Sequence, residues 1–208
     1  LLDPWNLVFG LAVLFLARIL GILYIINNVN DENIRRRGSA QLIGNSAVFL
    51  VLFLAFFFNT LLMHGYAYDQ ATGVIFTVPM KYFNNFIEMW YLAIIFVIGV
   101  VFLLYGIIRT VLSKVYIRGI WPAGIGVVLV VLALLLCTGW NNTAYYPSNA
   151  DLQSSLTIAN SCSSEFTLRT MAIVSIFIPF VLAYIVYAWY LIDKKKIDKD
   201  EIANDDAY

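Results

Sequence analysis

Long apolar runs dominate the pattern of hydrophobic and polar positions along the chain. Five runs approach the roughly 20 residues that a helix needs to cross the hydrocarbon core of a bilayer. They cover residues 6–26, 42–64, 90–108, 120–139 and 170–192. Because backbone polar groups cannot stay unpaired in lipid, we predict that each run is a transmembrane helix.

The connections between these runs differ in length and charge. The two long ones, residues 65–89 and 140–169, follow the second and fourth predicted spans and so lie on one side of the membrane. That side carries only Lys81 and Arg169, whereas ten of the 13 Lys and Arg residues lie on the other. The excess predicts that the first and third connections and the tail are cytoplasmic. The ten are Arg35, Arg36, Arg37, Arg109, Lys114, Arg118, Lys194, Lys195, Lys196 and Lys199.

This pattern predicts an all-α integral membrane protein with five transmembrane helices. We expect outer loops at residues 65–89 and 140–169 and a charged cytoplasmic tail at residues 193–208. Tryptophans stand at the ends of the spans, which favours interfacial anchors over a cofactor cradle. They are Trp5, Trp90, Trp121, Trp140 and Trp189.

Composition agrees with a membrane class. The chain is 62% apolar and 12% charged, with a mean hydropathy of +0.82, against about 45–50% and about 25% in soluble domains. A net charge of zero argues against nucleic acid as a partner. Two cysteines cannot build a disulfide framework, and without a basic stretch before the first apolar run we expect no signal peptide.

Residues that could bind a cofactor are few. His64 is the single histidine, at the outer end of the second span, and Met63 and Met80 are the nearest methionines. A haem usually needs one or two strong axial ligands, and no common metal, haem-attachment or phosphate-loop motif occurs. We therefore expect an interfacial hydrogen-bonding role for His64 and no catalytic, cofactor or metal site. The glycosylation sequon at Asn141 is interpreted as a chance match.

Four polar residues inside the spans are the main candidates for function. Arg18 lies in the first span, past its midpoint, where a central arginine costs about 2.5–3.5 kcal/mol; snorkelling would reduce that cost. Gln41, Asn45 and Asn59 are spaced to share one face of the second span. We expect that face to point into the bundle as hydrogen-bonding glue between helices, with a polar path for protons or a quinone headgroup as the alternative.

Two further features predict helix packing and helix capping. Small residues that allow close packing recur in the third and fourth spans, at Gly99, Gly106, Gly119, Gly124 and Gly126. Before the last span, Ser163, Ser164 and Glu165 have the composition of a helix start: a serine cap followed by a first-turn carboxylate. Upstream, residues 155–158 alternate polar and apolar, which indicates an extended segment over the outer surface.

Residues 154–171 form a mostly polar strip before and at the start of the last span, and this strip and its neighbours carry a family resemblance. The chain resembles subunit II of the cytochrome bd quinol oxidases over essentially its whole length, and specifically the C-terminal half of that subunit. The residues concerned are Pro147-Ser148, Ser155-Leu-Thr-Ile, Ser163-Ser164, Thr167-Leu168, Met171, Pro179, Tyr184, Lys199-Asp-Glu-Ile202, Tyr208 and, before the first span, Leu2-Asp-Pro4.

The resemblance implies a subunit of a terminal oxidase of the bacterial inner membrane that passes electrons from quinol to O2, forming water and generating proton-motive force. Haem b and haem d would belong to the partner, subunit I, and this chain would support it without a catalytic centre. It would form the second four-helix bundle of subunit II with residues 1–169 and the peripheral transmembrane helix with residues 170–192. Other implied partners are the N-terminal half of its own subunit, membrane lipid and quinone, with a structural quinone left open.

Two alternatives come from other classes. Half of a secondary transporter would favour internal repeats and broken helices near the midplane, but Pro179 is the single proline interior to a span. A structural subunit of a different respiratory complex would share the hydropathy pattern. A d-type haem in the optical spectrum of the purified complex would separate these readings.

Overall fold

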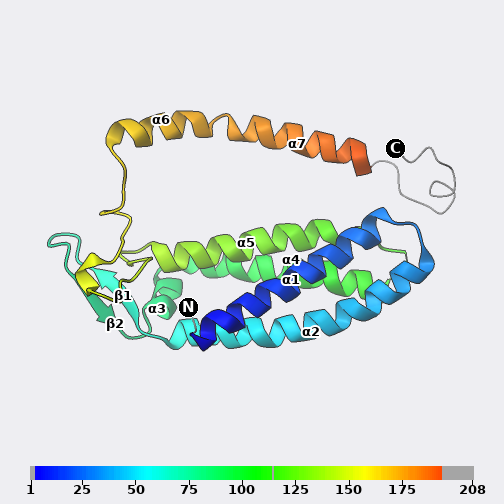
Figure 1. Ribbon diagram of the computed structural model, residues 1–208, viewed down its shortest axis with the longest axis horizontal. Coiled ribbons are helices and arrows are strands. Elements are labelled where there is room, and N and C mark those ends of the chain that lie inside the picture. The colour runs from blue at the N-terminus through cyan, green and yellow to red at the C-terminus, as the bar shows by residue number, and fades with distance from the viewer. Residues whose placement is uncertain (1–2, 114, 194–208) are drawn as a thin grey trace.

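The computed structural model describes residues 3–113 and 115–193 (Figure 1). The sequence motifs at Leu2, Lys114, Lys199–Ile202 and Tyr208, and the tail from residue 194 onward, lie outside this range. The elements are α1 (Pro4–Asn28), α2 (Glu32–Leu62), β1 (Gly65–Tyr68), β2 (Ile75–Val78), α3 (Lys81–Glu88), α4 (Trp90–Leu112), α5 (Ile120–Gly139), a 3-10 turn η1 (Leu152–Ser154), α6 (Glu165–Ser175) and α7 (Ile178–Asp193).

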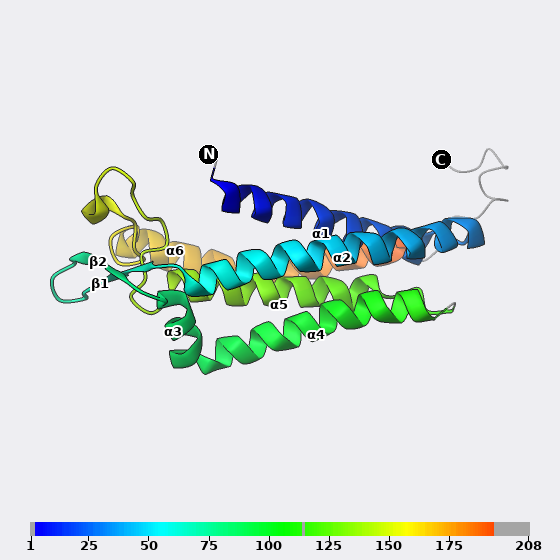
Figure 2. The ribbon, with the colours of Figure 1, turned by 90° about the horizontal axis from the view of Figure 1, so that it is seen from below.

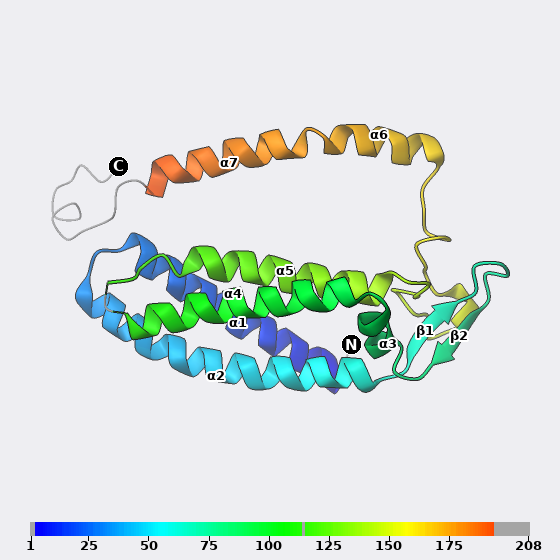
Figure 3. The ribbon, with the colours of Figure 1, turned by 180° about the vertical axis from the view of Figure 1, so that it is seen from behind.

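Four long helices form a bundle, and the last two stand beside it. Helix α1 packs mainly on α2, and α4 packs mainly on α5. Helices α6 and α7 run end to end along the bundle (Figures 1 and 3), and an edge-to-face contact between Tyr24 and Trp189 links α7 to α1. Five helical stretches are long and apolar enough to cross a membrane, with Glu165–Ile192 as the fifth. The predicted all-α membrane fold is confirmed.

The two ends of the bundle differ in composition. Figure 2 places α3, both strands and the start of α6 at one end. The connection from α1 to α2 and the ends of α4 and α7 lie at the other, so Arg35, Arg109 and Arg118 fall at the end opposite Lys81 and Arg169. All five tryptophans lie in the first or last turns of helices or directly at their caps, with exposed side chains, as interfacial anchors would.

Helix α2 begins ten residues before the predicted start of its span. Asp31 is the N-cap, and its carboxylate accepts hydrogen bonds from the backbone N–H groups of Asn33 (2.7 Å) and Ile34 (3.1 Å). The Arg35–Arg37 triplet therefore lies on helical turns instead of in a connection. Hydropathy located the part of the helix that suits lipid, but capping chemistry set where the helix starts. The helix ends at Leu62, so His64 follows it.

The last span is interrupted, and it starts at Glu165 rather than at residue 170. Pro179 has no N–H to donate to Ser175, which removes one bond of the helical ladder. The preceding turn tightens to i−3 bonds, from Ile176 N to Ile173 O (3.1 Å) and from Phe177 N to Val174 O (3.0 Å). The fifth span is therefore made of two helices, α6 and α7, that remain aligned end to end.

The connection between α2 and α4, predicted as an outer loop, contains secondary structure. Strands β1 and β2 pair antiparallel, with Gly65 opposite Val78 and Tyr68 opposite Ile75. The turn between them is closed by Asp69, whose carboxylate accepts from Ala71 N (3.1 Å) and Thr72 Oγ1 (2.7 Å). These bonds stabilise the ionised carboxylate and lower the pKa of Asp69.

Helices α4 and α5 approach so closely that side chains are excluded at four glycines. A Cβ added at Gly126 would lie 2.5 Å from the Gly99 carbonyl oxygen, and one at Gly106 would lie 2.5 Å from the Gly119 oxygen. Gly124, which the sequence grouped with them, has nothing within 4 Å of an added Cβ. It is not part of the packing surface because it faces away from α4.

Candidate functional site

The best-built polar site lies at the end of the bundle that carries the β1–β2 hairpin, which was predicted to be the outer end, and centres on Asn85 of α3. This side chain is fully buried. Its amide nitrogen donates to the Cys137 carbonyl (2.8 Å) and to Thr143 Oγ1 (2.9 Å), and its amide oxygen accepts from Asn141 Nδ2 (3.0 Å). One turn earlier, the Tyr82 carbonyl accepts from the Cys137 thiol (3.3 Å). Asn85 thus joins α3 to the end of α5 and to the second outer connection.

Asn141 extends the same network toward α3 and the hairpin. Its side-chain amide also donates to Glu88, and its carbonyl accepts from Lys81 Nζ (3.0 Å). Asn141 and Asn142 both have left-handed backbones, with φ of 56° and 52°, a conformation that asparagine tolerates better than most residues. The Asn142 carbonyl then accepts from Tyr68 N (2.9 Å) in β1. We call Asn85, Asn141, Thr143, Lys81 and Glu88 the outer network.

The outer network is suited to holding elements together. Its members are amides, a hydroxyl and one lysine beside one carboxylate, each hydrogen-bonded to another member or to backbone. Partial burial lowers the pKa of Lys81, an effect that Glu88 opposes, and burial raises the pKa of Tyr82. The sequon is a poor acceptor here, because Thr143 is buried and the Asn141 amide is engaged.

Sequence reasoning did not find the outer network, because its members come from two connections that are more than 50 residues apart in the chain. The available signal was a buried helix face in residues 81–88, where Tyr82 and Asn85 lie one turn apart. An asparagine on such a face must find hydrogen-bond partners, but the sequence does not say which.

The strip before the last span folds on itself through its polar residues. Ser155 and Thr157 are buried, whereas the intervening Leu156 is exposed. The Asn160 side chain forms hydrogen bonds with both of these residues, donating to Ser155 O (2.9 Å) and accepting from Thr157 N (2.7 Å). The Gln153 side chain ties this segment to β2 through two bonds with the Ile75 backbone, at 2.8 and 2.9 Å. The extended segment is short, because the chain turns at residues 158–160.

The cap residues sit at the start of α6. Ser164 occupies the N-cap position; its hydroxyl lies 3.4 Å from Thr167 N and 2.9 Å from Thr167 Oγ1. Ser163 precedes the cap. Glu165 is in the first turn and forms an exposed ion pair with Arg169 (2.9 Å). The structure therefore distinguishes the two serines that the sequence could not.

The three amides of α2 do not form one inward face. Asn45 is buried, but its amide donates to the Gln41 carbonyl of its own helix (2.7 Å). The Gln41 side chain is exposed and Asn59 is half-buried. The structure does not place Gln41 on the predicted inward face, since its side chain is exposed whereas Asn45, one turn later, is buried.

Arg18 lies on the exposed side of α1. Its guanidinium carbon is 5.9 Å from the centre of the Phe15 ring, one turn earlier. Within the described part of the chain, the structure shows no carboxylate at ion-pair distance from it. The side chain is therefore placed to meet lipid or a neighbouring protein.

The fold defines a multi-pass helical membrane protein with a polar cap at one end and a basic rim at the other. Comparison with protein families identifies it further. The family model of cytochrome bd terminal oxidase subunit II matches residues 1–192. The chain belongs to this family, so the resemblance predicted from the sequence is confirmed. A search of curated proteins found no match. The family forms part of a haem-containing quinol oxidase, with subunit I as its partner.

The residues considered as haem ligands lie at the surface of the described chain. His64 is exposed beyond the end of α2, and Met63 is also exposed. Among the described residues, no three His, Cys, Asp or Glu side chains are grouped closely enough to hold a metal ion. Between α2 and α4 the interior is filled by stacked rings, with Phe57 and Phe96 centred 4.7 Å apart and Phe53 next to them.

The Ser164 cap gives a first testable prediction. Ser164→Ala should lower the melting temperature of the oxidase complex, because losing a serine N-cap costs about 0.5–2 kcal/mol. Ser163→Ala is the matched control and should leave melting unchanged. Turnover per haem should stay near normal in both. Unchanged melting of Ser164→Ala with a turnover loss of tenfold or more would instead indicate a proton or substrate path along the strip.

Proposed function

We propose that this chain is a haem-free subunit of a cytochrome bd-type quinol:oxygen oxidoreductase. The match to the subunit II family carries this proposal. The exposed position of the single histidine, outside the packed interior of the bundle, supports the haem-free part. In this assignment haem b and haem d are bound by subunit I, where quinol is oxidised and O2 is reduced to water, and this chain has no catalytic centre.

In this proposal the chain stabilises the haem-bearing subunit by packing against it. Helices α6 and α7 expose nearly all their apolar side chains, and so does the outward face of α1 that carries Arg18. Such surfaces suit lipid and neighbouring transmembrane helices equally well in composition. We assign the neighbours as subunit I and the N-terminal half of subunit II, with this chain supplying the second four-helix bundle and a peripheral helix.

The orientation is part of the same proposal. The basic end, with Arg35, Arg109 and Arg118, would face the cytoplasm, as the asymmetry of Lys and Arg favours. The C-terminal tail would then be cytoplasmic. The outer network and the hairpin would close the opposite face of a bacterial inner membrane.

His64 provides the test. His64→Ala in the assembled oxidase should retain the b-type and d-type haem absorption bands at full amplitude, because the proposal gives this side chain no iron ligand role. Optical spectra normalised to the amount of complex measure this directly. Met80→Ala, at a second exposed position of the outer connection, is the control for general disturbance. Selective loss of one haem band in His64→Ala, with the complex still assembled, would overturn the haem-free assignment.

A further inference from the structure

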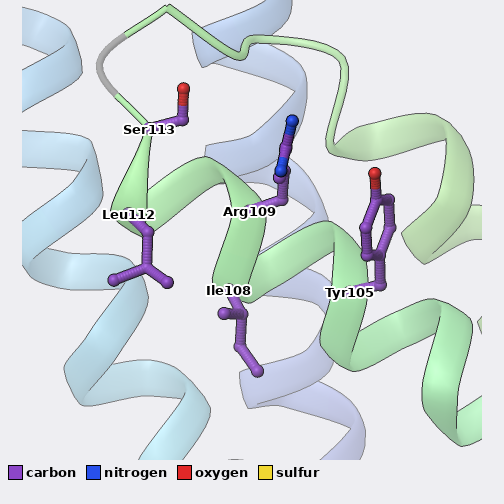
Figure 4. Close-up of a pocket in the computed structure, with 5 residues that line it drawn as sticks. All are labelled: Tyr105, Ile108, Arg109, Leu112 and Ser113. Carbon is purple, nitrogen blue, oxygen red and sulfur yellow. The ribbon is translucent and has the colours of Figure 1, made fainter.

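The inner end of α4 carries a cavity that none of the preceding contacts uses. It is open, measures about 700 Å3 and is lined by Tyr105, Ile108, Arg109, Leu112 and Ser113 (Figure 4). The lining follows one side of the last two turns of the helix. Tyr105, Ile108, Arg109 and Leu112 are all exposed. We call these five residues the α4 rim site.

Polar and apolar groups separate within the α4 rim site. In Figure 4 the polar tips of Tyr105, Arg109 and Ser113 point toward the C-terminal end of α4. The side chains of Ile108 and Leu112 extend the other way, toward the middle of the bundle. Because α4 ends at Leu112, we expect the polar tips at headgroup depth and the apolar pair at hydrocarbon depth.

The cation of the site is held in place yet carries an unneutralised charge. Arg109 lies against Tyr116, with its guanidinium carbon 5.7 Å from the ring centre, and Tyr116 contacts Tyr105 edge-on at 6.5 Å. No carboxylate lines the cavity, and among the described residues none pairs with Arg109. A second cation lies next to the site: the Arg35 guanidinium of α2 donates a hydrogen bond to the Ser113 carbonyl (3.0 Å).

A neighbouring cavity shows why charge singles out this site. It measures about 670 Å3 and has Asp31 and Glu32 beside Arg35 and Arg36. Its charge is mixed, so an anion entering it meets repulsion as well as attraction. The α4 rim site offers a positive charge with hydroxyl donors above an apolar floor, which is the complement of a phospholipid with a net negative headgroup.

We propose that the α4 rim site binds one anionic phospholipid. Its phosphate is held by Arg109 and by the hydroxyl groups of Tyr105 and Ser113, and an acyl chain lies along Ile108 and Leu112. A guanidinium favours a phosphate through charge-assisted hydrogen bonds, and basic residues at the membrane surface attract anionic lipid. The inference is independent of the haem assignment, since it concerns this chain and the bilayer.

The test uses the intact oxidase in detergent, titrated with phosphatidylglycerol and followed by native mass spectrometry. Arg109→Gln should weaken binding of the tightest lipid by about fivefold or more, the size expected for loss of one arginine at the surface. Arg118→Gln, an exposed arginine outside the cavity, is the matched control and should leave that lipid in place. Arg109→Lys should retain part of the affinity, which guards against a folding defect in the glutamine variant.

Three results would overturn the proposal. Equal losses in Arg109→Gln and Arg118→Gln would mean general surface attraction. Equal binding of zwitterionic phosphatidylcholine would remove the role of net charge. Displacement of the lipid by millimolar inorganic phosphate alone would mean that the apolar floor contributes nothing. The expected outcome is that the parent and Arg118→Gln bind phosphatidylglycerol but not phosphatidylcholine, and that only the Arg109 variants lose affinity for phosphatidylglycerol.

Discussion

Gly126→Val should strongly destabilise the bundle, while Gly124→Val, two residues away on the same helix, should be tolerated. At Gly126 even a Cβ would lie 2.5 Å from both the Gly99 carbonyl oxygen and the Leu103 nitrogen. These are backbone atoms, so α4 and α5 must move apart. Overpacking of a close contact costs about 1–3 kcal/mol, and occasionally more. At Gly124 an added Cβ meets nothing within 4 Å.

The measurement is the melting temperature and yield of the oxidase complex carrying each variant. Gly126→Val should melt well below the parent or fail to accumulate, and Gly126→Ala should show a smaller loss in the same direction. Gly124→Val controls for placing a β-branched residue in α5. Equal melting of the two valine variants would mean that the close approach of α4 and α5 is not required for stability.

Asn85→Ala should release the outer cap from the bundle. The change removes three hydrogen bonds at a fully buried position and leaves the Cys137 carbonyl and the Asn141 amide without that partner. Each buried polar group left unpaired costs about 1–3 kcal/mol, so a total of about 2–6 kcal/mol is expected for the two groups. This is large because the outer network is the main link between α3 and residues 140–144.

Asn84→Ala is the matched control, since Asn84 is the preceding residue of α3 and its side chain is exposed. Hydrogen exchange of the oxidase in detergent would locate the effect. Protection of Tyr68 and Ala144, whose N–H groups bond across to the Asn142 and Tyr66 carbonyls, should fall in Asn85→Ala and persist in Asn84→Ala. Full protection in both variants would contradict a locking role for Asn85.

Several features were predictable because they depend on the local sequence and the solvent. Hydropathy over about 20 residues located all five spans, since every buried backbone group in lipid must bond within its own helix. Helix α5 was predicted at its observed bounds, Ile120–Gly139. Local chemistry also bracketed the start of α6, although it left two candidate cap residues. The start of α2 was not predicted, even though Asp31 is a residue type that commonly caps helix N-termini.

Other features were decided only by the tertiary structure. Gly124 and Gly126 are the same residue type two positions apart, and only the rotation of α5 against α4 makes one essential and leaves the other free. The partners of Asn85 come from segments more than 50 residues away, and the sequence contains no rule for which amide meets which carbonyl. Hydropathy fixes how deep a residue sits in the membrane, but the direction it faces depends on packing between helices, and that is a property of the folded chain.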